Sequence, residues 1–332
     1  MKNKRAGAKR RTTMKPKMTR REMLVAGSAV IGSGVATRLA RGQAAGEVKT
    51  PEGAFVYCLN TSTVRGQKLP LVAELEIAAK VGYSAVEPWI NEIADYQKKG
   101  GMLADLKKRI ADLGLTIEDA IGFAEWIVND DAKRAKGLEQ AKRDMEMVAQ
   151  IGGKRIAAPA AGAVNVSDIP LAAIAERYGA LLEIGEQVGV APMIEVWGFS
   201  KTLTKLSDAV YAAVESRHAK ACVLTDVYHM YKGGSDADSL RLLSAQCIQM
   251  IHINDYPANP DRSKIKDEHR VFPGEGVAPL PKILRDIRGM GGKCVLSLEL
   301  FNPQYWKLDA TVCARTGLEK VKAAVQQSMQ IA

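Results

Sequence analysis

The chain has 332 residues, of which 47% are hydrophobic, and its formal net charge is +10. The excess of positive charge lies at the amino end, because residues 1–44 carry twelve of the 47 Lys and Arg residues and one of the 37 acidic residues, Glu22. The other 35 basic and 36 acidic residues give residues 45–332 a net charge of −1. The basic balance of the whole chain therefore gives no support for nucleic-acid binding, and we expect no nucleic-acid partner.

Residues 1–44 have the pattern of a twin-arginine export signal. Thr-Arg-Arg-Glu-Met-Leu at 19–24 is followed by an apolar run, rich in Gly and Ala, over residues 25–36, and small residues at 42–44 suit signal-peptidase cleavage. The run is too short and too rich in glycine to be a good membrane-spanning anchor. We expect the twin-arginine machinery to export the chain, with cleavage after Ala44, to the periplasm or the extracellular space. Residues 45–332 then form one domain.

The five cysteines are an odd number without the spacing of a metal site. Cys58, Cys222 and Cys294 lie in predicted strands, which favours buried apolar packing. A twin-arginine substrate folds before export, so unpaired thiols and a metal loaded in the cytoplasm are both compatible with an exported protein.

From residue 47 onward one pattern repeats: an amphipathic helix, a Gly that supplies a left-handed helix cap, and a short apolar strand. Four of the capping glycines, at positions 82, 114, 152 and 189, follow one another at the spacing of one strand–helix unit. Together with three further apolar runs, this pattern predicts eight strands, at residues 55–58, 84–87, 115–118, 155–158, 190–195, 222–226, 250–253 and 294–299.

Eight strand–helix units in a chain of this length predict an α/β fold, a (β/α)8 TIM barrel. The alternative is an open, doubly wound sheet, but no Gly-x-Gly-x-x-Gly follows the first strand. Two long segments, residues 256–272 and 301–310, follow the seventh and eighth strands. Loops at that end of a barrel usually shape a substrate pocket.

Four of the later strands end in ligand-type side chains: Glu195, Asp226, His252 and Glu299. Any one of them alone is as well explained as an ordinary polar residue at a strand end, but four at equivalent positions point to a shared site. Apolar neighbours alternate with them, so each should point to the barrel axis. Three carboxylates and one imidazole favour Mn²⁺, Mg²⁺ or Co²⁺, with Zn²⁺ also possible.

These residues resemble those of the xylose isomerase-like superfamily of sugar isomerases and epimerases. The resemblance covers residues 45–332 and rests on the two Glu, on Asp-x-x-His (Asp226, His229), on His-x-Asn-Asp (His252, Asn254, Asp255) and on Pro-Gly-Glu-Gly (273–276). It implies a (β/α)8 barrel in which the Glu, Asp, His and Glu carried here by residues 195, 226, 252 and 299 bind a metal. It also implies that Glu195 and Glu299 act as acid and base, and that His229 binds a substrate oxygen. Arg270 matches a substrate-binding Arg only across a loop of different length.

The chemistry expected of this set is proton transfer beside a carbonyl. A metal that chelates a carbonyl and its neighbouring hydroxyl acidifies the proton on the carbon between them. One carboxylate removes that proton to give a cis-enediolate and the other returns it, while a cationic His229 or Arg270 stabilises the enediolate oxygen. The predicted substrate is a small sugar, ketose or keto-acid.

Three other functions use the same fold. A lyase would lose a β-hydroxyl or glycosidic oxygen from a 3-keto sugar, keto-glycoside or inosose after the same proton abstraction. A DNA-repair endonuclease would need a His-rich cluster of three metals, and the chain has four His in all. A non-catalytic sugar-binding protein would not need an acid and a base. The sequence does not predict the oligomeric state.

Several other residues have both a functional and a structural interpretation. Glu87 could bind a sugar hydroxyl or an inner-barrel water, and the structural interpretation is somewhat favoured. His269 is interpreted as a solvated loop residue and His218 as a charge partner at a helix end. Half of the four tryptophans are expected to line the pocket, where aromatic faces stack on sugars, with Trp197 the foremost candidate; the four are Trp89, Trp126, Trp197 and Trp306.

Overall fold

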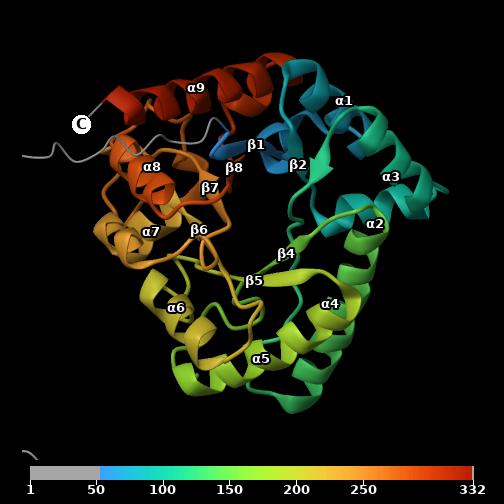
Figure 1. Ribbon diagram of the computed structural model, residues 1–332, viewed down its shortest axis with the longest axis vertical. Coiled ribbons are helices and arrows are strands. Elements are labelled where there is room, and N and C mark those ends of the chain that lie inside the picture. Colours follow the sequence, from blue (N-terminus) through green and yellow to red (C-terminus); the bar gives the residue numbers. More distant parts are fainter. Residues whose placement is uncertain (1–52, 331–332) are drawn as a thin grey trace, which may run out of the picture. The chain divides into compact units, whose positions relative to one another are not determined.

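The structure is a computed structural model that describes residues 53–330, so the predicted export signal at residues 1–44 lies outside the described residues. Eight parallel strands in one sheet are wrapped by helices (Figure 1). This is the predicted TIM barrel. Its strands are β1 (Phe55–Asn60), β2 (Ala85–Glu87), β3 (Thr116–Ile117), β4 (Arg155–Ala158), β5 (Ala191–Glu195), β6 (Val223–Asp226), β7 (Met250–Ile253) and β8 (Cys294–Leu298).

The sheet curls so that its first and last strands in the sequence are neighbours. The strand order is β3-β2-β1-β8-β7-β6-β5-β4. A backbone hydrogen bond of 2.9 Å from Ala157 N–H to the Ala120 carbonyl then joins β4 to the segment that follows β3. This closure brings the carboxyl ends of the strands to one mouth of the barrel.

Helices form the outer layer around the strands, and α9 lies beside both α8 and α1, so that the last helix completes the ring (Figure 1). The α-helices are α1 (Leu71–Val81), α2 (Ile90–Lys98), α3 (Leu103–Asp112), α4 (Asp131–Gln150), α5 (Leu171–Val188), α6 (Leu206–Glu215), α7 (Val227–Gly233), α8 (Leu280–Gly289) and α9 (Ala310–Gln330). Short 3-10 helices cover Thr61–Gln67, Ala237–Leu242, Asp267–His269 and Tyr305–Lys307.

The glycines predicted to end helices do so through a left-handed backbone. Gly82 caps α1 with φ 102° and Gly189 caps α5 with φ 82°. Only glycine adopts these angles without a steric penalty. The sequence pattern therefore placed these strand starts to within one residue.

One segment differs from the sequence prediction. No helix was predicted directly after Asp226, but residues Val227–Gly233 form helix α7. The side chain of Asp226 accepts a 2.8 Å hydrogen bond from the backbone N–H of His229 and thereby caps this helix. The turn fixes His229 next to the end of β6.

Two layers of inward-pointing side chains fill the barrel. The lower layer is apolar, and its buried members include Cys58, Ala85, Met193, Leu224, Met250 and Val295. Polar residues follow two positions later on the same strands, which places them on the same inner face. They are Asn60, Glu87, Glu195, Asp226, His252 and Ser297, and all of them are buried. Apolar side chains therefore close the barrel beneath a polar upper layer.

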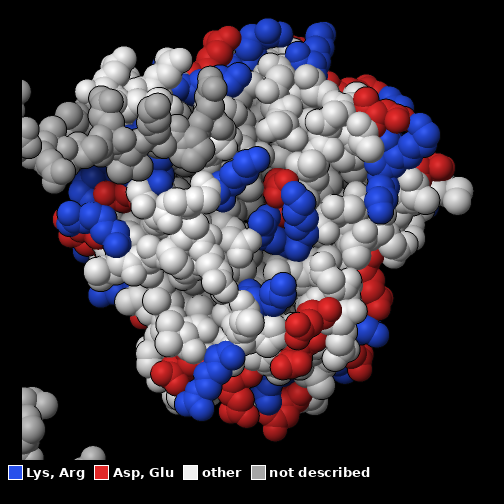
Figure 2. Space-filling model, viewed as in Figure 1, with Lys and Arg blue, Asp and Glu red and all other residues white. Residues whose placement is uncertain are grey.

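The predicted burial of Cys58, Cys222 and Cys294 is confirmed, and these cysteines are free thiols. Among residues 53–330 no helix is both long enough and apolar enough to cross a membrane. Figure 2 shows Lys and Arg intermixed with Asp and Glu at the periphery of the face in view, and mainly Lys and Arg around its centre. This face does not carry one continuous basic field.

Candidate active site

The four ligand-type side chains predicted from the sequence meet inside the barrel, at the carboxyl ends of β5 to β8. The Nδ1 atom of His252 lies 3.9 Å from Glu195 Oε1, 3.6 Å from Asp226 Oδ2 and 3.2 Å from Glu299 Oε2. All four side chains are 5% exposed or less. These four residues are called the acidic cup below. The period-2 alternation of the strands correctly predicted that they point inward.

The acidic cup is a buried space that favours positive charge. Burial raises the pKa of Glu195 to about 8. Burial also opposes ionisation of Asp226 and Glu299, but Arg270 and His252 outweigh it and lower the pKa of both carboxyls. Burial disfavours a charged His252, yet the nearby carboxylates, with Glu299 foremost, raise the pKa of this imidazole. Three acids around one ring therefore attract a cation.

The residues of the cup fit a divalent metal. His252 Nδ1 and Glu195 Oε2 are buried and have no hydrogen-bond partner among the described residues, and buried polar atoms are rarely left in that state. A metal ion takes the place of the proton on an imidazole nitrogen, so a site that raises the pKa of His252 also attracts a cation there. Carboxylate oxygens with one imidazole nitrogen suit Mn²⁺, Mg²⁺, Co²⁺ or Zn²⁺.

Glu87 lies behind the cup and not at a substrate surface. It is fully buried, and its Oε1 is 2.9 Å from Nε2 of His252. Its Oε2 accepts hydrogen bonds from Asn60 Nδ2 at 2.7 Å and from Ser297 Oγ at 2.6 Å. A carboxylate that binds the far nitrogen of a ligand imidazole fixes the ring and its tautomer. The geometry thus favours a positioning role for Glu87 over a contact with a sugar hydroxyl, which was the less favoured of the two interpretations drawn from the sequence.

Replacing Glu87 with Ala is expected to weaken metal binding by roughly 10–100-fold, because the His252 ring loses the partner that orients it. Glu87→Gln keeps an acceptor oxygen, so its affinity for the metal should lie between those of the wild type and Glu87→Ala. Titration of the metal-free protein by calorimetry measures the effect. Glu118→Gln is the control, since Glu118 pairs with Lys154 and Arg155 away from the cup. Equal affinities for Glu87→Ala and the control would rule the role out.

His229 lies beside the cup and is neutral. Its Nε2 is 3.0 Å from Nη2 of Arg270, and because a guanidinium only donates, Nε2 accepts and the ring proton is on Nδ1. Burial and Arg270 lower the pKa of His229, which corrects the expectation of a cationic ring. The residue lines a small pocket above the cup, and its Nδ1 has no partner in residues 53–330. This N–H is therefore a buried donor without an acceptor among the described residues.

Arg270 is engaged by the cup and not by the pocket. Its Nη1 donates to Asp226 Oδ2 at 2.8 Å and to Glu299 Oε2 at 2.7 Å, while Nη2 donates to Asp267 Oδ1. The guanidinium is 1% exposed and does not line the small pocket. Its visible effect is to hold Glu299 in place and lower the pKa of that carboxyl.

The small pocket above the cup has a volume of about 130 Å³ and an aromatic wall. The ring centroids of Trp89 and Phe123 are 5.2 Å apart, those of Phe123 and Trp197 6.0 Å, and those of Trp197 and Phe199 5.3 Å. Phe301 continues the wall 6.1 Å from Trp89. Such rings present flat apolar surfaces to the C–H faces of a sugar.

Two of the four tryptophans therefore line the pocket, Trp89 and Trp197, as the sequence predicted. The other two are anchored elsewhere. Trp126 donates from its indole N–H to the Pro159 carbonyl at 2.9 Å, and Trp306 to the Ser62 carbonyl at 3.0 Å.

The family model described as "Xylose isomerase-like TIM barrel" matches residues 75–327. The chain belongs to this family. Two curated relatives of this chain are described with different activities. One is an inosose isomerase of Bacillus licheniformis, 26% identical over 82% of this chain and 99% of the relative. The other is a 3-dehydroshikimate dehydratase of Pseudomonas aeruginosa, 25% identical over 76% of this chain and 39% of the relative.

Among solved structures, the chain is similar to one described as the IOLI protein with a zinc atom bound. The TM-score is 0.76 at 23% identity, over 82% of this chain and 99% of that one. At this identity the likeness establishes the shared barrel fold.

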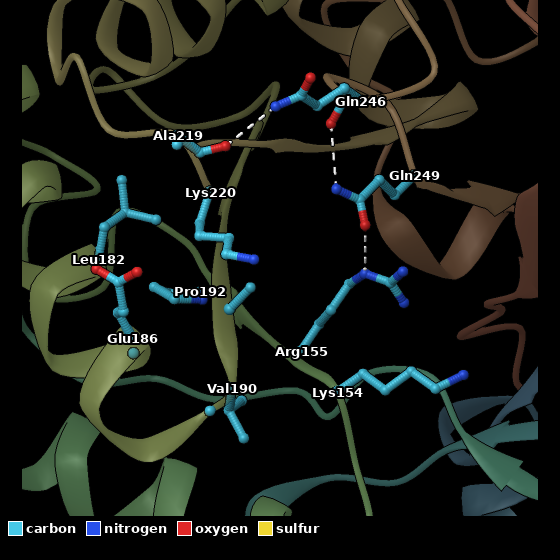
Figure 3. Close-up of a pocket in the computed structure, with 13 residues that line it drawn as sticks. Lys154, Arg155, Leu182, Glu186, Val190, Pro192, Ala219, Lys220, Gln246 and Gln249 are labelled. Atoms are coloured by element: carbon cyan, nitrogen blue, oxygen red, sulfur yellow. Dashed lines mark hydrogen bonds between the residues drawn. The ribbon is translucent and has the colours of Figure 1, made fainter. Parts of the chain in front are cut away.

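A larger pocket, of about 610 Å³, opens at the amino ends of the strands, opposite the cup (Figure 3). Several of its polar groups have partners in the protein. Arg155 Nε donates to Gln249 Oε1 at 3.0 Å, and Gln246 Nε2 donates to the Ala219 carbonyl at 3.0 Å. Arg155 also pairs with Glu118 at 3.1 Å. Members of this barrel fold carry out their chemistry at the other mouth, so these contacts are interpreted as structural.

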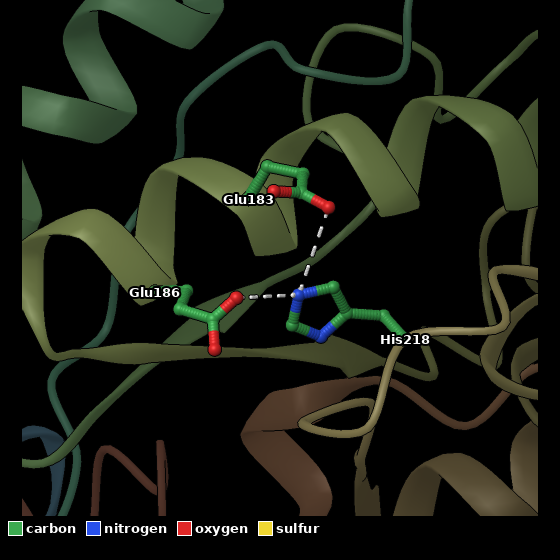
Figure 4. A group of neighbouring side chains, drawn as sticks. All are labelled: Glu183, Glu186 and His218. Carbon is green, nitrogen blue, oxygen red and sulfur yellow. Dashed lines mark ion pairs between the residues drawn. The ribbon is translucent and has the colours of Figure 1, made fainter.

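A second cluster with ligand-type side chains lies on the outer surface, where Glu183 and Glu186 of α5 face His218 (Figure 4). His218 Nε2 is 3.4 Å from Glu186 Oε2 and 4.0 Å from Glu183 Oε1. The backbone N–H of Lys220 donates to Nδ1 at 3.1 Å, so the ring proton is on Nε2. The nitrogen that faces the carboxylates therefore has no lone pair for a metal. The expectation of a charge partner for His218 at a helix end fits this arrangement.

Sequence reasoning missed Asn60, Ser297 and the rings of Phe123, Phe199 and Phe301. Asn60 Nδ2 reaches Glu87 and, at 3.3 Å, Glu299 Oε1. The alternation of strand side chains could have found Ser297. It precedes Glu299 by two positions, so both side chains point to the inside of the barrel. The phenylalanines lie in loops, where no periodicity applies.

Proposed function

We propose that this protein is a divalent-metal-dependent isomerase or epimerase of a small sugar, ketose or keto-acid. The observation that carries the proposal is the convergence of Glu195, Asp226, His252 and Glu299 in one buried cup below an aromatic pocket. The family and the isomerase relative support the reaction class. A metal held by the cup would polarise a substrate carbonyl and acidify the neighbouring C–H.

The two glutamates are proposed to move the proton. They project from β5 and the end of β8, on opposite sides of the His252 imidazole in the strand order. Burial raises the pKa of Glu195, whereas His252 and Arg270 lower that of Glu299 despite its burial, and carboxyls in such different environments suit acid and base roles. Asn60 and Arg270 hold the Glu299 carboxylate by hydrogen bonds, and this fixes the direction from which it reaches the substrate.

The remaining residues of the pocket are proposed to bind and orient the substrate. The free N–H of His229 donates to a substrate oxygen, and Trp197 packs on the sugar ring. The aromatic wall excludes water from the cup, which strengthens each polar contact inside it. We further propose, from residues 1–44, that the protein acts after export.

A second candidate is a carbon–oxygen lyase that uses the same cup. The relative described as a dehydratase supports it. The two reactions share the proton abstraction and differ in whether a β-hydroxyl or glycosidic oxygen then leaves.

Incubation with keto sugars and keto-glycosides in deuterated water, after loading with Mn²⁺, Mg²⁺, Co²⁺ or Zn²⁺, tests both candidates. Mass spectrometry should show uptake of deuterium beside the carbonyl, with the carbon skeleton intact for an isomerase or epimerase. Loss of water or of an alcohol marks the lyase. Absence of both deuterium uptake and mass loss across the panel would contradict the proposed chemistry.

A further inference from the structure

A second pocket, of about 430 Å³, adjoins the small pocket over the cup and shares two of its walls, Trp89 and Phe123. It is more than three times as large as the small pocket. The side chains that matter for its chemistry are Arg65, Trp89, Asn91, Phe123, Gln140 and Asp144. Trp89 and Phe123 thus stand between the two spaces, and the second pocket is called the outer subsite below.

The shared walls form an aromatic platform that is held in place. The guanidinium carbon of Arg65 lies 3.6 Å from the centroid of Trp89, a stacking contact between a cation and a ring. Asn60 Oδ1 accepts the indole N–H of Trp89 at 3.1 Å. The ring of Phe123 lies beside the indole. Platforms of this kind bind flat rings, including the C–H faces of sugars.

Polar groups converge on the same outer subsite. Asp144 of α4 is 5% exposed, and its Oδ2 has no hydrogen-bond partner among residues 53–330. Burial raises the pKa of Asp144 to about 6. A buried carboxyl oxygen without a partner is a feature that needs an explanation, and a ligand hydroxyl would supply the missing bond. The exposed amides of Asn91 and Gln140 stand nearby.

The same walls disfavour a phosphorylated substrate. Within the described part of the chain no Lys lines the small pocket or the outer subsite. Arg270 is engaged by Asp226, Glu299 and Asp267. Among residues 53–330, Arg65 is the one Arg that lines either pocket, against four acidic side chains, Asp144, Glu195, Asp267 and Glu299. The small pocket, at about 130 Å³, is also below the roughly 300–1,000 Å³ typical of drug-sized ligands. This size favours one small ring over two.

From these contacts we propose that the substrate has two rings: the reacting keto ring over the acidic cup, and an uncharged, hydroxyl-bearing ring in the outer subsite. This inference rests on the proposed function for the reacting ring. The second ring stacks on Trp89 and Phe123, and its hydroxyls bond Asp144, Asn91 and Gln140. The substrate is then a glycoside, whose second ring is either another sugar or a hydroxylated aromatic group.

Binding of unreactive probes tests the outer subsite separately from catalysis. Calorimetry on the Mn²⁺-loaded protein compares methyl β-glucoside, with one ring, to methyl β-cellobioside and to 4-hydroxyphenyl β-glucoside, with two. These probes carry no ketone in the reacting ring, so failure of the proposed reaction leaves the comparison intact. At least one two-ring probe should bind about tenfold more tightly than the one-ring probe, because it adds a stacked ring and new hydrogen bonds. The tighter of the two identifies the second ring as sugar or aromatic.

Two variants locate the gain in affinity. Asn91→Ala, at an exposed position, and Asp144→Asn, an isosteric change, should each reduce the two-ring advantage by roughly three- to tenfold. Glu139→Gln on the exposed face of α4 is the control and should keep the advantage. Equal affinities for one- and two-ring probes in the wild-type protein would overturn the proposal. The proposal would also be overturned if two-ring probes kept their full advantage in affinity over the one-ring probe in both Asn91→Ala and Asp144→Asn.

Discussion

Glu299→Gln is expected to abolish turnover while the barrel stays folded. The amide is isosteric and its one oxygen can still accept from either Arg270 or Asn60, but it cannot take or return a proton. General acid–base groups contribute about 10²–10⁴-fold, so we expect kcat to fall by roughly 10³-fold or more. Deuterium uptake and thermal melting, measured on the same preparation, separate lost chemistry from lost structure.

Glu268→Gln is the matched control for this experiment. Glu268 is exposed and pairs only loosely with Lys266, at 3.9 Å. Its amide variant should turn over substrate at the wild-type rate. If Glu299→Gln retained activity within a few-fold of wild type, the acid–base assignment would be wrong.

His252→Ala is expected to remove metal-dependent stability. A ligand at 100 times its Kd stabilises a folded protein by about 2.7 kcal/mol, which corresponds to a rise of roughly 5–10 °C in Tm for a domain of this size. The wild-type protein should show this rise when Mn²⁺ is added to metal-free samples. The variant loses the nitrogen ligand, so its Tm should change by less than about 2 °C.

His218→Ala serves as the comparison, because it removes the histidine of the only other ligand-type cluster found among the described residues. The His218→Ala variant should show the same rise in Tm on addition of Mn²⁺ as the wild-type protein. A rise that persists in His252→Ala and disappears in His218→Ala would place the metal on the outer surface and contradict the acidic cup.

Much of the barrel could be predicted because its signals are local. Gly82 and Gly189 end their helices through backbone angles that other residues avoid, so they mark strand starts in the sequence itself. The predicted bounds of β4 and β7 agree with the structure at both ends. Helix α7 was missed because its cap, the side chain of Asp226, was interpreted only as a ligand.

The acidic cup was also predictable, for a different reason. Strand residues alternate between faces, so an acid or imidazole two positions after an inward apolar residue must itself point inward. Met193 precedes Glu195 in this way, and Met250 precedes His252. Closure of the sheet then brings separate strands to the same axis.

By itself the sequence determined the eight-stranded barrel and the four side chains at its mouth. Helix caps and the alternation of strand side chains depend on residues close together in the sequence, so both could be predicted from it. Only the tertiary structure decided what surrounds them. It placed Glu87 behind His252, made His229 a neutral donor to the pocket, and turned Arg270 toward the carboxylates. These roles depend on burial and on contacts between residues far apart in the chain. Neither produces a regular spacing of residues from which it could be predicted.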